Sequence, residues 1–468
     1  MMKITISNKI KIENPSPELL KYAKQELEIP NPEFQKKFRM GLWTGGTPPK
    51  LILYEKSGSD LILPWGTIRD VVSLATGAAF EVSRATIANP HYLSRIEFGT
   101  VDLYDYQKKA VRTMVMQIFS GGILQAPPGS GKTQMGLAIA AVNHRKTLWL
   151  THTKDLLLQS KERAERYFDP AIIGTITEGK VNIGTGITFA TVQTMARLDL
   201  PQYKNEWDLV IVDECHRVAG TPTALTMFAK VLGNLDASKV GLSATVHRAD
   251  GLIKATFALI GPVVYEVPEE EVADTVMPVH VVPVETKSVL TRQAQNTDGT
   301  LNYAGLINSL CEDEDRNKLI KSLIEGDVGH SILVLSDRLE HLVHLQDMLS
   351  PELKDQSVFI NGKMTSKVAK AARVEAIRDM RAGVKKILFA TYSLAKEGLD
   401  IPILDRLILA TPQSDSAIVE QSLGRIARKA PEKESPVCYD IVDSRISYLA
   451  NAFRKRSSTY KKKKYPIG

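Results

Sequence analysis

The chain has 468 residues, 43% hydrophobic and 24% charged, which is too long for a single core and ordinary for a globular protein. No apolar run approaches the roughly 20 residues that cross a bilayer, and the three cysteines lack metal-ligand or CxxC spacing, so we expect a cytoplasmic protein without a zinc site or disulfide framework. The net charge is +7, and residues 446–468 hold seven Lys or Arg and no acid, which accounts for the whole excess.

Residues 1–98 predict a small α+β accessory domain. Residues 3–14 alternate like a hairpin, a helix begins after Ser16 as N-cap, and residues 50–65 read as a second hairpin that turns at Gly58.

The segment 34–43 of this domain interleaves three basic residues with three aromatics. Basic and aromatic side chains together can attract phosphates and stack on bases, which makes this a candidate nucleic-acid contact. The alternative is an amphipathic helix that buries the aromatics in the domain's own core. The candidate contacts are Lys36, Lys37 and Arg39.

Residues 99–445 repeat a pattern of short apolar runs, polar turns and helices. Near-continuous Val/Ile/Leu runs alternating with helices are typical of parallel strands buried on both faces. We therefore expect two α/β sheets in series, residues 99–268 and 269–445, with the seam near residues 261–275 and a polar surface insertion over 286–305. Residues 446–468 predict a basic tail that contacts phosphates or, alternatively, only aids solubility.

The strongest motif is residues 126–133, APPGSGKT, which follows an apolar run and precedes a helical stretch. This is the Walker A form with Ala in place of the first Gly, and its backbone N–H groups can surround phosphates. Lys132 adds a positive charge and the Thr133 hydroxyl can bind Mg²⁺. The phosphate-binding candidates are Pro128, Gly129, Ser130, Gly131, Lys132 and Thr133.

An acidic pair, Asp213 and Glu214, ends the apolar run DLVIVDE. Asp213 would hold Mg²⁺, and Glu214 would orient and activate the attacking water. Such a pair without Walker A would be read as a helix-starting acidic cap. The two motifs together predict ATP hydrolysis with Mg²⁺.

Further blocks over residues 103–430 resemble superfamily 2 helicases: LYDYQKKA at 103–110, DECH at 213–216, SAT at 243–245, ATYSLAKEGLD at 390–400 and QSLGRIAR at 421–428. The resemblance implies two RecA-like lobes that hydrolyse ATP while holding nucleic acid. It assigns Gln107 to adenine, Gly398 and Asp400 to the ATP site, and His216, Ser243 and Thr245 to coupling ATP hydrolysis with nucleic acid.

The last block predicts a helix over residues 417–429 with Ser416 as N-cap. Gln421, Arg425 and Arg428 would then share one face, where an arginine can stabilise charge during phosphoryl transfer.

The same resemblance nominates strand contacts at the C-terminal ends of predicted strands, where open α/β sheets bind ligands. These are Thr151, His152, Thr191, Gln193, Ser336, Asn361, Gly362 and Thr391.

In layout and length the chain is most similar to the UvsW-like recombination helicases of tailed phages. That likeness implies a monomer acting on DNA, with a single tracking strand and forks or junctions as partners, in the host cytoplasm if a phage encodes it. An RNA helicase remains an open alternative, because phosphate contacts do not distinguish the polymers. A third alternative is an ATP-gated nucleic-acid clamp, against which Arg425 and Arg428 argue, because a pure binding module has no need of transition-state stabilisation.

Overall fold

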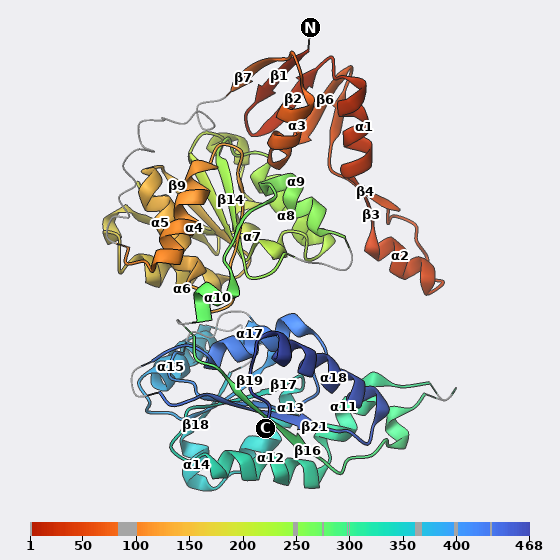
Figure 1. The fold of residues 1–468 in the computed structure, drawn as a ribbon, viewed down its shortest axis with the longest axis vertical. Coiled ribbons are helices and arrows are strands. Elements are labelled where there is room, and N and C mark those ends of the chain that lie inside the picture. Colours follow the sequence, from red (N-terminus) through yellow and green to blue (C-terminus); the bar gives the residue numbers. More distant parts are fainter. Residues whose placement is uncertain are drawn as a thin grey trace. The chain divides into compact units, whose positions relative to one another are not determined.

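A computed structural model describes residues 2–82, 101–246, 251–273, 276–296, 298, 300–360, 367–396, 401–430 and 433–468. The chain divides into two compact units, Met1–Glu271 and Val272–Gly468 (Figure 1). The division falls within helix α10 (Glu269–Ala273), close to the expected boundary after residue 268. Among the described residues, no helix is both long and apolar enough to cross a membrane.

The first unit begins with a five-stranded sheet in the order β5-β6-β2-β1-β7. Alternate isoleucines of β1 and β2 face inward, as period-2 patterning predicts, and pack against α1 and α3. Ser16 caps α1 as expected, because its side chain accepts a hydrogen bond from the Leu19 N–H. The elements are β1 (Lys3–Ile6), β2 (Lys9–Glu13), α1 (Pro17–Glu26), β5 (Glu55–Ser57), β6 (Asp60–Pro64), η1 (Trp65–Thr67), α3 (Ile68–Leu74) and β7 (Ala79–Val82).

The second expected hairpin is shorter than the sequence predicts. β5 and β6 pair around Gly58, but residues 50–52 form β4 (Lys50–Ile52), which pairs with β3 (Glu28–Pro30). Between β3 and β4 lies α2 (Pro32–Arg39), away from the five-stranded sheet in Figure 1. Ile29 of β3 packs into the core of the following α/β domain, so the base of this arm is anchored there.

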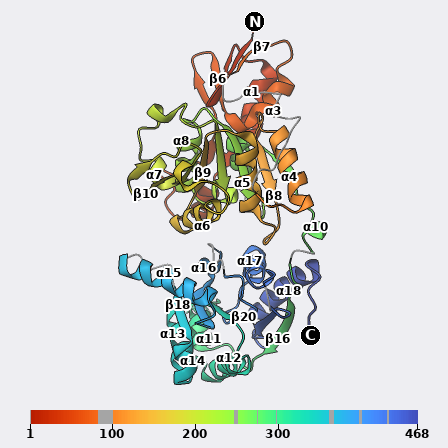
Figure 2. The same ribbon diagram turned by 90° about the vertical axis from the view of Figure 1, so that its left-hand side faces the viewer.

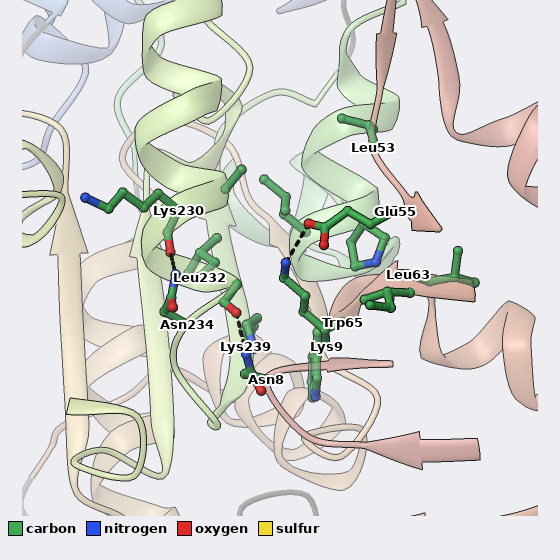
Figure 3. Close-up of a pocket in the computed structure, with 15 residues that line it drawn as sticks. Asn8, Lys9, Leu53, Glu55, Leu63, Trp65, Lys230, Leu232, Asn234 and Lys239 are labelled. Carbon is green, nitrogen blue, oxygen red and sulfur yellow. Dashed lines mark hydrogen bonds and ion pairs between the residues drawn. The ribbon is translucent and has the colours of Figure 1, made fainter. Parts of the chain in front are cut away.

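The small domain packs directly against that α/β domain within the same unit. A Cβ on Gly66 would lie 2.4 Å from the Phe257 carbonyl oxygen, so only glycine permits this approach of η1 to α9 (Ile253–Ile260). Beside this contact, the Lys239 Nζ lies 4.5 Å from the Trp65 ring centroid. Both residues line a cavity of about 240 Å³ between the two domains (Figure 3).

The α/β domain of the first unit is built on an eight-stranded sheet in the order β11-β10-β12-β9-β13-β14-β8-β15. All neighbours pair in parallel except β10 and β11, as the apolar runs predict. The strands are β8 (Gly122–Gln125), β9 (Thr147–Thr151), β10 (Ile173–Thr177), β11 (Lys180–Asn182), β12 (Ile187–Thr191), β13 (Leu209–Asp213), β14 (Ser238–Ser243) and β15 (Val263–Glu266).

Helices cover both faces of this sheet. Alternate residues of β9 and β13 belong to the core that contains α7, α8 and α9, whereas α5 and α6 contact the sheet outside that core. The helices are α4 (Asp105–Met116), α5 (Lys132–Asn143), α6 (Lys154–Ala164), α7 (Val192–Met195) and α8 (Pro222–Leu232), with 3-10 turns η3 (Pro170–Ile172), η4 (Leu200–Tyr203) and η5 (Cys215–Arg217).

The second unit holds a six-stranded, all-parallel sheet in the order β16-β21-β20-β17-β19-β18. The strands are β16 (His280–Glu285), β17 (Ile332–Ser336), β18 (Ser357–Ile360), β19 (Ile387–Thr391), β20 (Arg406–Leu409) and β21 (Val437–Val442).

Two helical layers bury this sheet (Figures 1 and 2). Leu333 and Leu335 of β17 pack into the core that includes α15 to α18, whereas Ile332 and Val334 pack into the core that includes α12 to α14. This explains why the strand reads as an unbroken apolar run. The helices are α11 (Tyr303–Cys311), α12 (Glu314–Gly326), α13 (Leu339–Asp347), α14 (Pro351–Asp355), α15 (Lys367–Arg381), α16 (Tyr392–Lys396), α17 (Ser416–Ile426) and α18 (Ser447–Lys462).

Residues 446–468 do not form the free tail that their charge predicts. They form α18, whose Arg456 is buried and pairs with Asp440 at 2.9 Å, and a terminal segment in which Ile467 bridges Val281. The count of charges predicted a tail because it does not register that one side of α18 is buried.

The expected surface insertion over residues 286–305 is also partly buried. The Thr286 hydroxyl donates to Asp443 at 2.7 Å, and η6 (Arg292–Ala294) ends on a buried residue.

Candidate active site and nucleic-acid contacts

The phosphate loop lies between β8 and α5, at the carboxyl edge of the first sheet. Gly129 and Gly131 have φ of 85° and 77°, in the left-handed region that favours glycine. A Cβ on Gly131 would lie 2.5 Å from the Gln107 Nε2, so a larger residue would displace that amide. The backbone conformation therefore explains both glycines of the motif.

Two residues of α4, Tyr106 and Gln107, hold the phosphate loop by hydrogen bonds. The Tyr106 hydroxyl and the Gln107 Nε2 both donate to the Ser130 carbonyl oxygen, at 2.9 and 2.8 Å. The Gln107 Oε1 accepts from the Tyr104 N–H at 2.9 Å. Gln107 is thus a buried brace of the loop, a role that the motif alone does not reveal.

Asp213 and Glu214 stand at the end of β13, which is separated from β8 by β14 alone. Asp213 is buried and accepts hydrogen bonds from the Ser160 hydroxyl at 3.3 Å and the Glu214 N–H at 3.0 Å. Burial, and then the Glu214 carboxylate, raise the pKa of Asp213 to about 6, while Lys132 opposes the rise. Lys132 therefore lies close enough to act on Asp213, so the two motifs share one site.

His216 connects this acidic pair to the SAT segment. Its Nδ1 lies 3.0 Å from the Ser243 Oγ and 3.3 Å from the Glu214 Oε2. The Ser243 hydroxyl donates its proton to the Thr245 carbonyl oxygen at 2.6 Å, so the His216 Nδ1 must carry the hydrogen that Ser243 accepts. The structure thereby links His216, Ser243 and Thr245 by hydrogen bonds and places the Glu214 carboxylate beside the His216 ring.

The described residues of this site fit a nucleoside triphosphate with a divalent cation. The Ser130 Oγ is buried without a hydrogen-bond partner at the centre of the loop, and Thr133, half-buried, follows at the start of α5. Among the described residues, no three His, Cys, Asp or Glu side chains form a metal cage. Mg²⁺ in phosphate sites uses one or two protein oxygens together with phosphate oxygens, and the Thr133 hydroxyl and the Asp213 carboxylate are oxygens of that kind.

The second unit carries the arginine block on α17. Its N-cap is Asp415, one residue before the expected Ser416, because the Asp415 carboxylate accepts from two backbone N–H groups of the first turn. Gln421 and Arg425 lie one turn apart on this helix, but the helix ends at Ile426. The expectation that Arg428 shares their face through helical spacing is therefore wrong, since its backbone bridges to residue 276 instead.

Lys433 is a residue of this region that the motifs do not identify. Its Nζ donates to the Arg428 carbonyl oxygen at 2.7 Å and to the Pro402 carbonyl oxygen at 3.1 Å. It thus ties the end of the arginine block to the chain that follows the fifth block. Burial lowers the pKa of Lys433 to about 8.

The strand-contact candidates of the first unit meet at the carboxyl edge of the sheet. Thr151 and Thr191 are register partners at the ends of β9 and β12, and the Gln193 Nε2 donates to the His152 carbonyl oxygen at 2.8 Å. The Thr151 hydroxyl donates to the Thr153 carbonyl oxygen at 3.0 Å. The Thr191 hydroxyl lies 3.0 Å from that of Thr194, and both are buried.

Ser336 and Thr391 are likewise register partners, at the ends of β17 and β19. Ser336 is fully buried, 3.0 Å from the His341 Nδ1. The His341 Nε2 lies 2.9 Å from the Asn317 Oδ1, an amide oxygen that only accepts, so Nδ1 accepts the Ser336 proton. Burial, and then Arg316, lower the pKa of His341 to about 3, which keeps the ring neutral. Four more candidates, Asn361, Gly362, Gly398 and Asp400, lie outside the described residues.

The arm around α2 does not bury its aromatics, contrary to the amphipathic alternative. Phe38 is 71% and Trp43 83% exposed. Lys36 and Arg39 are exposed beside them, whereas Lys37 pairs with Glu33 at 2.9 Å. The arm thus presents aromatic and basic groups together on a surface anchored to the first unit.

Two family models match the chain. Residues 100–248 match the model described as the res subunit of type III restriction enzymes, and residues 315–430 match the helicase conserved C-terminal domain. Together they cover the phosphate loop, the DECH and SAT segments and the arginine block.

Similar proteins include a putative ATP-dependent RNA helicase, L396, of Acanthamoeba polyphaga mimivirus, 28% identical over 75% of this chain and 66% of its own length. The ATP-dependent DNA helicase uvsW of Enterobacteria phage T4 is 22% identical over 92% of this chain and 86% of its length. The structure of S. cerevisiae Dbp5 bound to RNA and ADP BeF3 has a TM-score of 0.53 and 17% identity, over 78% of this chain and 93% of Dbp5. The expected fold class, with two parallel α/β lobes, is confirmed.

Proposed function

The chain belongs to the superfamily 2 helicases, which are ATP-dependent enzymes that act on nucleic acid, and on this premise we propose that it is a DNA helicase or translocase that unwinds or branch-migrates forked and junction DNA. The observation that carries the proposal is the contact chain from Glu214 through His216 to Ser243, beside the phosphate loop. DNA is favoured over RNA by the T4 uvsW match, which extends through the small N-terminal domain.

ATP and Mg²⁺ fit the first unit. Backbone N–H groups of residues 128–133 and the Lys132 ammonium would hold the phosphates, and Thr133 and Asp213 would hold Mg²⁺. The Gln107 amide keeps one N–H and one acceptor lone pair beyond its two observed hydrogen bonds, and we assign these to adenine. When bound, ATP supplies the β–γ phosphoanhydride bond, whose hydrolysis releases the free energy for movement.

Glu214 acts as the general base in this proposal. The His216 Nδ1 lies 3.3 Å from the Glu214 Oε2, so the imidazole ring packs beside this carboxylate oxygen and limits its orientation. The Glu214 Oε1 is then the atom that accepts a proton from water. Because the His216 Nδ1–H bonds to Ser243, a shift of the SAT segment would move the ring that lies beside Glu214, which is a physical route for coupling.

Gln421, Arg425 and Arg428 are assigned to stabilising the charge that develops during hydrolysis, and we include Gly398 and Asp400 in the same ATP site.

Nucleic-acid contacts are assigned to the carboxyl edges of both sheets. Since the hydroxyl protons of Thr151 and Ser336 are engaged within the chain, backbone N–H groups and the half-buried side chains supply the phosphate donors there. The side chains so assigned are His152, Gln193 and Thr391, with Thr191, Asn361 and Gly362 at the same edges.

ATPase and strand-displacement assays with matched DNA and RNA forks test the proposal. We expect DNA to stimulate hydrolysis more than RNA, and Glu214→Gln to abolish turnover while ATP and DNA binding persist. Glu165→Gln, at the exposed residue that follows α6, is the matched control and should keep full turnover. Stronger stimulation by RNA would favour the RNA helicase, and hydrolysis without strand displacement would favour the clamp.

A further inference from the structure

The exposed face of α18 carries an unusual concentration of positive charge. Arg454, Lys455, Lys461 and Lys462 are all exposed, and no ion pair forms with any of them among the described residues. At 100° per residue these four positions fall within about one third of the helix circumference, so they form one stripe. We call these four residues the α18 basic face.

The opposite side of α18 fixes this face to the second sheet. The Arg456 guanidinium pairs with both oxygens of Asp440 on β21, and the Tyr460 hydroxyl donates to the same carboxylate at 2.7 Å. Arg456 also donates to the Gln413 carbonyl oxygen at 2.8 Å, in the loop before α17. The basic face is therefore held rigidly rather than on a mobile tail.

The direction of α18 separates the basic face from the strand contacts. The strands of this sheet are parallel, and α18 begins just after β21, at the carboxyl edge that also holds Ser336 and Thr391. The segment after α18 pairs with Val281, at the amino end of β16. The helix therefore runs from the carboxyl edge toward the amino edge, and its cations lie along the flank of the lobe.

From this arrangement we infer that the α18 basic face binds the phosphate backbone of a duplex arm, separate from the strand held at the carboxyl edges. This rests on the proposed function and names a second nucleic-acid surface for it. Residues 454 and 455 lie seven positions from 461 and 462, about 10 Å along the helix, comparable with the roughly 12 Å width of the DNA major groove. Two pairs of cations at that interval match phosphates on both sides of a groove. Like charges gathered without acids favour a polyanion as the partner.

The test replaces all four residues with glutamine: Arg454→Gln, Lys455→Gln, Lys461→Gln and Lys462→Gln. Affinity for a blunt duplex and for a single strand is measured by fluorescence anisotropy over a range of salt. We expect duplex affinity to fall at least tenfold and the salt slope to flatten by about 3.6, since each of the four lost phosphate contacts removes about 0.9 from the slope. Single-strand affinity and single-strand-stimulated ATPase should stay within twofold of wild type.

A matched control removes the same charge from cations that already have acidic partners. Lys318, Lys354, Arg378 and Lys385 pair with Asp315, Asp347, Glu375 and Asp355, and their replacement with glutamine should leave duplex affinity within twofold. A Lys→Arg variant at 455, 461 and 462 should retain wild-type affinity.

Unchanged duplex affinity in the α18 variant, or an equal loss for single strands, would overturn the inference. So would an equal loss in the control variant, because net charge alone would then explain the effect. Wild-type protein that binds duplex through α18 but fails to displace strands would instead remove the proposed helicase function, so the two failures are distinguishable.

Discussion

Lys239 is the individual residue whose environment conflicts most with its chemistry. It is buried on β14 against Trp65, and its Nζ donates to the Ala237 carbonyl oxygen at 2.9 Å. Burial lowers the pKa of Lys239 to about 7, although Asp236 opposes the shift. Between about pH 7 and 10.5, Lys239 is therefore neutral in the folded protein but charged in the unfolded chain.

Lys239→Met should make stability less dependent on pH. Below about pH 7, the wild type holds a charged lysine in the interior, which costs free energy. Between about pH 7 and 10.5 the unfolded chain binds the extra proton, so the wild type gains stability as the pH rises and the variant does not. The difference in Tm, variant minus wild type, should therefore fall from pH 6 to pH 9 in thermal unfolding. A constant or rising difference would show that Lys239 does not titrate in this range.

Among the helices, α2 and α18 both have amphipathic sequences, but only α18 packs one side into a core. In α18 the apolar side is buried and the basic side exposed, whereas α2 buries no residue. The short α2 projects between β3 and β4, so its aromatics have no core to reach. Phe34 and Phe38 instead stack on each other with ring centroids 6.2 Å apart.

We expect the α2 arm to select branched substrates. Lys36→Ala with Arg39→Ala should weaken binding to forks and four-way junctions more than to single strands, because we assign the single strand to the edges of the α/β sheets. Trp43→Ala should add a loss of roughly 1–3 kcal/mol if a base stacks there. Lys37→Ala is the control with a smaller effect, since Glu33 already neutralises Lys37. Equal losses for forks and single strands, in titrations with folded protein, would contradict this role.

In the whole molecule, the residues that we assign to ATP hydrolysis occur in both units of the chain. Glu214 and Lys132 belong to Met1–Glu271, and Arg425 and Arg428 belong to Val272–Gly468. We propose that both sets act in hydrolysis and that, in a monomer, one chain supplies both.

Mixing Glu214→Gln chains with Arg428→Ala chains should therefore restore no ATPase activity. Arg428→Ala alone should keep ATP affinity within a few fold and lose most DNA-stimulated hydrolysis, because its charge matters only in the transition state. Steady-state ATPase rates of the mixture, measured against each variant alone, give the answer. Recovery toward about a quarter of the wild-type rate, the share of intact sites that random pairing of the two variants would give, would mean that two chains share a site and that the monomer prediction is wrong.

The sequence alone determined the features that depend on neighbouring residues. The phosphate loop, the acidic pair and the parallel strands follow from local spacing and apolar runs, because a loop that surrounds phosphates and a doubly buried strand each impose a local pattern. Tertiary structure decided which long-range partners each side chain found. It turned the expected tail into a packed helix, placed Arg428 beyond the end of α17, and engaged the hydroxyl of Ser336 with His341. Such outcomes depend on burial and on hydrogen-bond partners from distant segments, which spacing along one chain does not encode.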